Sequence, residues 1–246
     1  MRQSLFQSNA VKTLALRGLR GYFETPSAYV ALFVFYLLAG YLFAFPLFLL
    51  GQASIKSLMD FAPLLLSFLI PALTMGLISE EIKSGTFETL ATLPLQDWDI
   101  VLGKYLGFAG LALTAVGGLL FFPLALSALV QPQSGVDWGE SLGILAGLAW
   151  LSLMYGAAGL FASSLTKNQI VAFVSSFMIS FFFFVCGKFA GLLPGPLGGL
   201  AEFVGVDSHL SNMAKGVLDT RDLLYFLSVI AAFLYLTVER LQARRF

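Results

Sequence analysis

Six apolar runs, separated by short polar stretches, constrain the fold of this chain more than any other feature. They cover residues 27–50, 61–78, 105–130, 141–165, 169–187 and 223–238. A helix needs about 20 apolar residues to cross the hydrocarbon core of a bilayer. Only 11% of the 246 residues are charged, against about 25% in a soluble domain. We therefore predict an all-α membrane protein with six transmembrane helices in a single domain, residues 1–246.

The ends and bends of these spans can also be predicted. The last run is short, and we expect it to extend through Asp222 and Glu239, whose side chains can reach the interface, with Asp219 capping its first amides. Proline inside a helix removes a hydrogen bond and kinks it. Kinks are therefore expected at the prolines inside three of the spans, Pro46, Pro71 and Pro123.

The basic residues indicate how the chain is oriented. If both termini are cytoplasmic, ten lysines and arginines lie inside and four lie outside, out of fourteen. The four outside are Lys56, Lys188, Lys215 and Arg221. Since cytoplasmic loops carry the excess of basic residues, both termini are predicted to face the cytoplasm.

The first 26 residues have an amphipathic pattern. One helical face carries Val11, Leu14, Ala15, Gly18, Leu19 and Tyr22, while Arg17, Arg20 and Glu24 fall on the other. Such a helix is expected to lie in the membrane surface rather than cross it. It acts either as an anchor that fixes topology or as a contact for a cytoplasmic partner.

Several energy sources and chemistries find no support in the sequence. None of the six runs contains Asp, Glu, Lys, Arg or His, so a proton relay through the membrane is not expected, whereas sodium coupling through backbone carbonyls stays open. The single histidine, His209, is read as a residue of the last external loop, and no metal or other cofactor is expected in this chain. The two Gly-Lys pairs lack the spacing of a P-loop, so the chain is not expected to hydrolyse ATP by that route.

One charged segment, residues 80–104, interrupts this apolar chain. The second span is expected to continue as helix through Glu81 and to end near Gly85. Residues 86–93 then read as a two-turn helix that Pro94 ends, and Asp97 is expected to cap the helix of the third span. A short helix between two membrane helices could transmit a push to both, so we expect energy to enter here from outside the chain.

This segment also carries a family resemblance. The stretch EEIKSGTFETLATLPLQDWDIVLGKYLG, residues 80–107, resembles the cytoplasmic signature of type-2 ABC transporter permeases. Two further stretches, GLFASSLTKNQIVAF (159–173) and GVLDTRDLLYFLS (216–228), are similar to the branch that includes the gliding-motility-associated permease of bacteria. With the six-span layout, the resemblance covers essentially the whole chain.

The resemblance implies a permease, expected to be an exporter, in a bacterial cytoplasmic membrane. It would pair with a second copy or a sister permease and bind two cytoplasmic ATP-binding cassette subunits, which would hold the ATP and Mg²⁺. Residues 86–93 match the family's coupling helix, which sits in a cleft of the ATPase. The positions that match its motif, and are expected at the ATPase contact, are Glu80, Glu81, Gly85, Thr86, Glu88 and Pro94.

Short helices are expected in the external segment, residues 188–222. Leu210, Met213, Ala214 and Val217 follow one another at helical spacing there, and they would either cover the exit of a pathway or form a packed cap. Gly139, Gly143 and Gly147 form a small-residue face for close packing, within the subunit or against another permease.

Two other readings stay open. A sodium-coupled carrier or a passive channel would need no ATPase partner. A membrane scaffold of a surface or motility machine would bind an ATPase and transport nothing.

Overall fold

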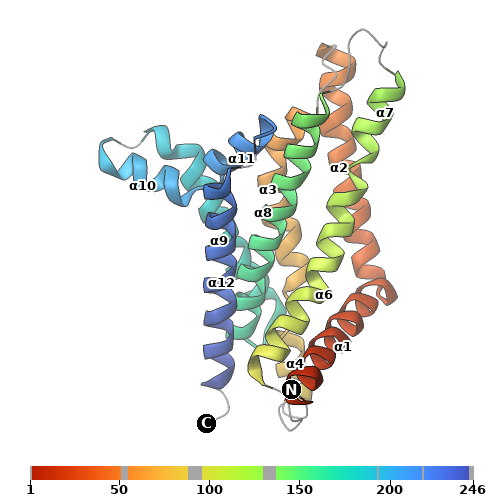
Figure 1. Cartoon of the computed structure of the whole chain (residues 1–246), viewed down its shortest axis with the longest axis vertical. Helices are drawn as coiled ribbons and strands as arrows, with labels where there is room; N and C mark the ends of the chain where they lie inside the picture. The colour runs from red at the N-terminus through yellow and green to blue at the C-terminus, as the bar shows by residue number, and fades with distance from the viewer. Residues whose placement is uncertain are drawn as a thin grey trace.

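The computed structural model describes residues 2–50, 55–87, 96–129, 137–192, 194–217 and 219–243, and every regular element among them is helical (Figure 1). The long helices are α1 (Arg2–Glu24), α2 (Pro26–Leu50), α3 (Lys56–Thr74), α6 (Asp97–Gly118), α8 (Trp138–Leu165), α9 (Gln169–Phe189) and α12 (Thr220–Gln242). The short ones are α4 (Ser79–Ser84), α7 (Phe121–Leu129), the 3-10 helix η2 (Ala190–Leu192), α10 (Pro196–Val204) and α11 (Val206–Ala214).

Six stretches of the described chain are long and apolar enough to cross a membrane. They are Ala28–Phe48, Leu58–Ser84, Asp97–Ala128, Trp138–Leu165, Gln169–Leu192 and Thr220–Gln242. The predicted all-α membrane fold with six spans is therefore confirmed. The N- and C-terminal ends of the chain lie at the same end of the bundle, together with α4 (Figure 1). We call this the inner end, since the sequence predicts that it faces the cytoplasm.

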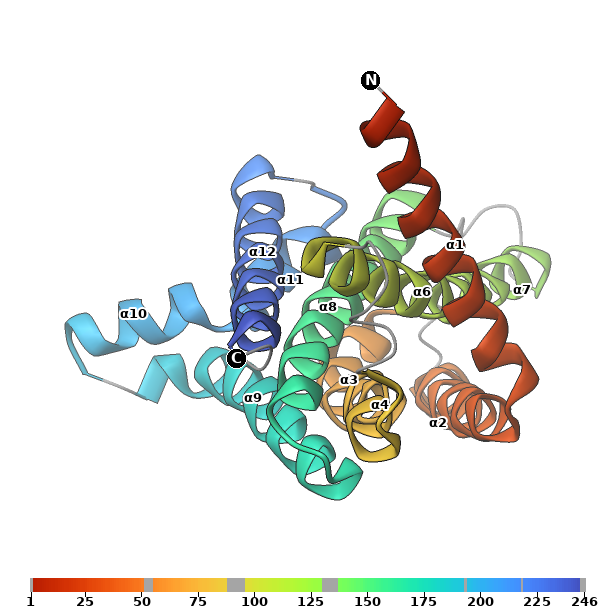
Figure 2. The same ribbon diagram turned by 90° about the horizontal axis from the view of Figure 1, so that it is seen from below.

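Helix α8 lies at the centre of the bundle and packs against α3, α6, α9, α11 and α12 (Figure 2). Its Leu148, Leu151 and Tyr155 are completely buried. Because lipid is as apolar as a leucine side chain, close packing rather than water exclusion holds such helices together. Gly156 of α8 allows this close packing, because it leaves room for the Phe108 ring of α6. A Cβ added at Gly156 would overlap that ring.

The third span bends between α6 and α7, near the predicted proline kink. The helix is interrupted at Leu119 and Leu120 and resumes at Phe121. Pro123 has no N–H for the Leu119 carbonyl, and its ring crowds the carbonyl four residues before it. The Leu119 carbonyl instead accepts the Phe122 N–H at 3.0 Å. Around Pro46, by contrast, helix α2 stays unbroken.

The last span is longer than its apolar run, as the sequence predicts. Helix α12 runs from Thr220 to Gln242 and so includes Asp222 and Glu239. Asp219 is its N-cap, and the Asp219 carboxylate accepts the Arg221 N–H at 2.9 Å.

Of the two external helices, α11 packs on the bundle, whereas α10 projects away from it beside α9 and has no buried residue (Figure 2). Leu210 and Met213 of α11 are buried, and Gly143 of α8 lies against the backbone of Met213 and Gly216. The small-residue face of α8 therefore serves packing within the subunit.

The reading of His209 as a loop residue is wrong, because it lies in α11 and is 9% exposed. Its Nδ1 is 2.6 Å from the Asp222 carboxylate, and its Nε2 is 3.2 Å from the Phe203 carbonyl. The ring also stacks on Tyr225 at a centroid distance of 4.0 Å. Burial follows because both polar edges of the ring have partners inside the protein.

Candidate functional site

The second span is broken at the inner end, directly before the charged segment. Helix α3 ends at Thr74, residues 75–78 form turns, and α4 begins at Ser79. The second span reaches Ser84 and ends at Gly85, as predicted, but its helix is interrupted at residues 75–78 rather than continuous. The reason lies in α8, whose Ser163 replaces the missing helical bonds. Its Oγ accepts the N–H groups of Ile78 and Ser79, both at 3.0 Å, and donates to the Met75 carbonyl at 2.8 Å.

A buried lysine binds the other side of this break. Lys104 of α6 donates from Nζ to the Leu77 carbonyl at 2.7 Å and pairs with Glu81 Oε1 at 2.6 Å. The Lys104 side chain is only 14% exposed. Glu81 Oε2 is buried and has no hydrogen-bond partner among the described residues. One side chain thus joins the turn, α4 and α6.

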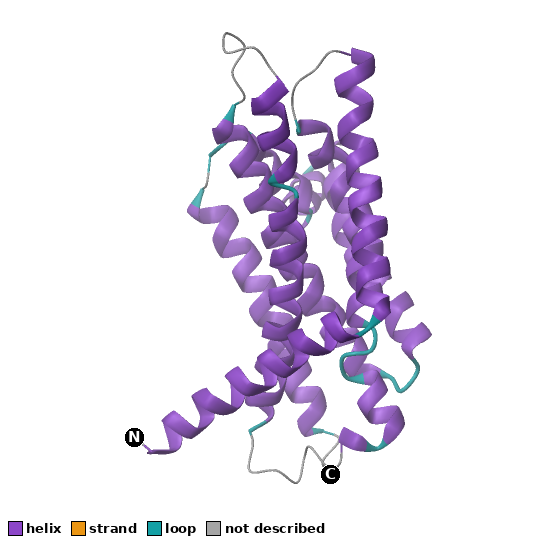
Figure 3. Cartoon of the chain, turned by 90° about the vertical axis from the view of Figure 1, so that its right-hand side faces the viewer, coloured by secondary structure: helices purple, strands orange, loops and turns teal. Residues whose placement is uncertain are grey.

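Helix α1 braces the same region from a third side. The Tyr22 hydroxyl donates to the Leu73 carbonyl of α3 at 2.9 Å, and burial raises the pKa of Tyr22, which keeps the hydroxyl protonated as a donor. Gly107 of α6 lies against the backbone of Ala15 and Gly18, where an added Cβ would come within 3.0 Å of the Ala15 carbonyl oxygen. Helix α1 therefore rests directly on α6 and leaves the bundle obliquely at the inner end (Figure 3).

The predicted amphipathic face of α1 is the one in contact. Val11, Leu14, Ala15, Gly18, Leu19 and Tyr22 are all partly buried, whereas Arg17, Arg20 and Glu24 are exposed. That this helix lies in the membrane surface stays a prediction.

We call the turn at residues 75–78, together with Ser163, Lys104 and Glu81, the inner joint. It holds three spanning helices at one point through side chains that replace backbone hydrogen bonds. Where a membrane helix is broken, the freed backbone groups need partners inside the protein. The joint therefore ties the position of α4 to α6 and α8.

Four of the six predicted contact residues lie in the described chain, next to this joint. Gly85 caps α4 with φ 74°, a left-handed conformation that favours glycine, which confirms the predicted helix end. The Thr86 hydroxyl is 2.9 Å from the Ser84 hydroxyl. Glu81 is bound to Lys104, while the exposed Glu80 lies against Gly76.

The other two predicted contact residues, Glu88 and Pro94, lie outside the described residues, as does most of the predicted helix at 86–93. Phe87, the first apolar residue of that helix, is 8% exposed and packs in the core. The start of the segment is therefore anchored to the bundle.

Helix α6 begins differently from the prediction. Gln96, not Asp97, is its N-cap, and the Gln96 N–H donates to the Asp99 carboxylate at 3.0 Å. This is a capping box shifted by one residue. Asp97 is the first helical residue instead.

Two residues of the joint were missed as site residues. Lys104 is predicted only as a cytoplasmic basic residue before the third span and as part of the family signature, and Ser163 only as part of a second family motif. A lysine beside an apolar run can be recognised in the sequence as a candidate site residue, since it must find a polar partner there. Ser163 gives no such signal, because its three partners lie 84 to 88 residues away in the sequence.

Six apolar spanning helices and a polar joint at their inner end define a polytopic membrane protein built from a single helical bundle. The family model described as ABC-2 family transporter protein matches residues 51–204, more than half of the 246 residues, so the chain belongs to that family. No curated protein matches the chain.

Family membership settles the general role. The chain is a membrane-spanning permease component of an ABC transporter, and it works with ATP-binding cassette subunits rather than being the ATPase itself. The matched range runs from the segment before α3 to the end of α10, and it includes the inner joint.

Proposed function

We propose that this permease is an exporter driven by separate cytoplasmic ATP-binding subunits that bind the segment from Glu80 to Pro94. Those subunits would hold ATP and Mg²⁺. When they close on ATP, they move α4 and the residues after it, and the inner joint passes this movement to the third and fourth spans. The export direction and the bacterial cytoplasmic membrane rest on the family resemblance.

The inner joint is the observation that carries this proposal. A helix that merely continued out of the membrane would pass movement along its own span alone. Here α4 is separated from α3 by four residues and is bound to α6 by Lys104, while Ser163 binds the turn to α8. Movement of α4 therefore acts on α6 as directly as on its own span.

The charges at the inner end support a protein partner on that side. Under the predicted orientation, ten of the fourteen basic residues belong to it, which is the cytoplasmic pattern. The contact residues that are exposed, Glu80, Gly85 and Thr86, follow one another along α4 and its cap. They are accessible to a subunit approaching from the cytoplasm.

Co-expression with the candidate ATPase subunit tests the proposal. We expect Glu88→Ala combined with Gly85→Val to reduce co-purification of the ATPase at least about tenfold, within the range found when a few contact residues carry an interface. Lys215→Gln, at the external end, is the matched control and should leave assembly unchanged. If the ATPase co-purifies equally with the wild type, the Glu88→Ala/Gly85→Val variant and the Lys215→Gln control, the proposed contact is wrong.

A further inference from the structure

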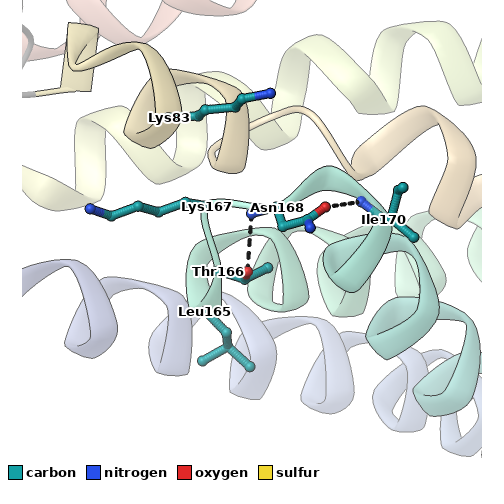
Figure 4. A pocket seen from close by; sticks show the side chains of 6 residues that line it. All are labelled: Lys83, Leu165, Thr166, Lys167, Asn168 and Ile170. Carbon is teal, nitrogen blue, oxygen red and sulfur yellow. Dashed lines mark hydrogen bonds between the residues drawn. The ribbon is translucent and has the colours of Figure 1, made fainter.

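A polar pocket of about 810 Å³ opens at the inner end, between α4 and the turn that joins α8 to α9. Its lining residues are Lys83, Leu165, Thr166, Lys167, Asn168 and Ile170. In Figure 4, Lys83 lies above the turn and Lys167 extends from the turn itself. Both lysines are exposed, so their ammonium groups can reorient toward a ligand.

Hydrogen bonds fix the shape of the turn below the lysines. The Asn168 N–H donates to the Thr166 hydroxyl at 3.1 Å, and the Asn168 side chain accepts the Ile170 N–H at 2.9 Å (Figure 4). The negative end of the α8 dipole and the positive end of the α9 dipole meet here and largely offset each other.

The net positive charge of the pocket therefore comes from the two lysines. Among the described residues, neither Lys83 nor Lys167 forms an ion pair. The nearby Glu80 carboxylate lies against Gly76 beside the Gln169 amide and is not among the lining residues. The pocket thus offers two unneutralised cations to an anion.

The position of the pocket relative to the spans indicates what kind of anion fits. Lys83 precedes the last residue of the span Leu58–Ser84, and Lys167 lies between the spans that end at Leu165 and begin at Gln169. Both cations thus lie at the inner ends of apolar spans, where the sequence predicts the cytoplasmic interface of the membrane. From the inner end of α9 toward its external end, an exposed apolar stripe is formed by Ile170, Val174 and Met178. Their exposed fractions are 71%, 48% and 60%.

From this arrangement we infer that the pocket binds the phosphate headgroup of an anionic phospholipid from the inner leaflet. One acyl chain of that lipid lies along the stripe of α9. A free phosphate would use the two lysines but not the stripe, and a neutral lipid would use the stripe but not the lysines. Only an anionic lipid matches both halves of the site. Lys83 also lies in the segment proposed to bind the ATPase, so the test below uses the chain purified without that subunit.

Native mass spectrometry of the purified chain, from bilayers of equal parts phosphatidylglycerol and phosphatidylcholine, tests this site. We expect the wild type to retain phosphatidylglycerol preferentially. The double variant Lys83→Gln/Lys167→Gln should lose about 30-fold in affinity for phosphatidylglycerol, since each basic residue near an anionic leaflet contributes about a fivefold factor. The double variant Lys12→Gln/Lys215→Gln, which removes the same number of charges away from the pocket, is the charge-matched control and should retain the lipid.

Three results would overturn the inference. The first is equal lipid retention by the wild type and the double variant. The second is lysine-dependent binding of inorganic phosphate with no preference for the anionic lipid, which would make the pocket a site for free anions. The third is unchanged lipid retention together with loss of ATPase co-purification in the double variant, which would assign the lysines to a protein partner.

Discussion

Lys104 is the residue whose environment most clearly distinguishes this bundle from a simple set of lipid-packed helices. We expect Lys104→Met to destabilise the protein by about 1–3 kcal/mol, because it leaves the partly buried Glu81 carboxylate and the Leu77 carbonyl without their partner. Thermal unfolding of the solubilised protein should show this as a fall in Tm of about 5–10 °C.

The double variant Lys104→Met/Glu81→Leu serves as the control for that loss. Since replacing both members of a buried pair by apolar groups removes the unpaired charge, it should recover part of the stability. A double variant less stable than Lys104→Met alone would contradict the assigned ion pair.

Ser163 has a neighbour that makes a matched comparison possible. Ser163→Ala removes the acceptor for two backbone N–H groups of another element and should cost about 1–3 kcal/mol. Ser164→Ala removes only a bond to the Phe161 carbonyl within α8, so its cost should stay below about 1 kcal/mol. Chemical unfolding in mixed micelles measures both, and equal costs would exclude the bridging role of Ser163.

Two acid–base pairs at the external end differ in burial and should differ in strength. His209 and Asp222 have side chains that are 11% and 5% exposed, whereas those of Lys188 and Asp207 are 35% and 38% exposed. Asp222→Asn should therefore lower Tm by several degrees, through a loss of about 2–3 kcal/mol. Asp207→Asn should cost no more than about 1 kcal/mol. A larger fall in Tm for Asp207→Asn than for Asp222→Asn would show that the contact between His209 and Asp222 does not hold α11 against α12.

At the scale of the elements, the contact between α1 and α6 depends on the small residues of α6. Gly107→Leu would push its side chain into the backbone of Ala15 and Gly18, so α1 should separate from α6. Hydrogen exchange of the α1 amides should become faster in this variant. Gly117→Leu, on the same helix but with no atom within 4 Å of an added Cβ, is the control. Unchanged exchange in both would contradict the packing of α1 on α6.

The elements also show which parts of the fold a sequence can predict. The spans, the amphipathic face of α1 and the helix end at Gly85 follow from local patterns, namely apolar length, helical periodicity and a glycine C-cap. The break at residues 75–78 was missed because apolar sequence continues through it and the groups that stabilise it come from α6 and α8. His209 was misread for the same reason, since its partner Asp222 belongs to another helix. Long-range polar contacts leave no local periodicity to read.

For the whole molecule, we propose that the ATPase acts on α4 and that the inner joint passes this movement to the third and fourth spans. Binding of the ATPase and coupling to it are then separate properties, one belonging to the exposed face of α4 and the segment that follows it, and the other to Lys104 and Ser163. Variants of the joint should keep the first and lose the second.

The most direct test is the permease-dependent stimulation of ATP hydrolysis in membranes that contain the assembled complex. For Lys104→Met, at a temperature where the variant is folded, we predict normal co-purification of the ATPase with stimulation reduced by about tenfold, within the range of coupling energies between linked sites. Lys12→Met on α1 should behave like the wild type. Normal assembly together with undiminished stimulation in Lys104→Met would contradict the claim that the inner joint carries the movement.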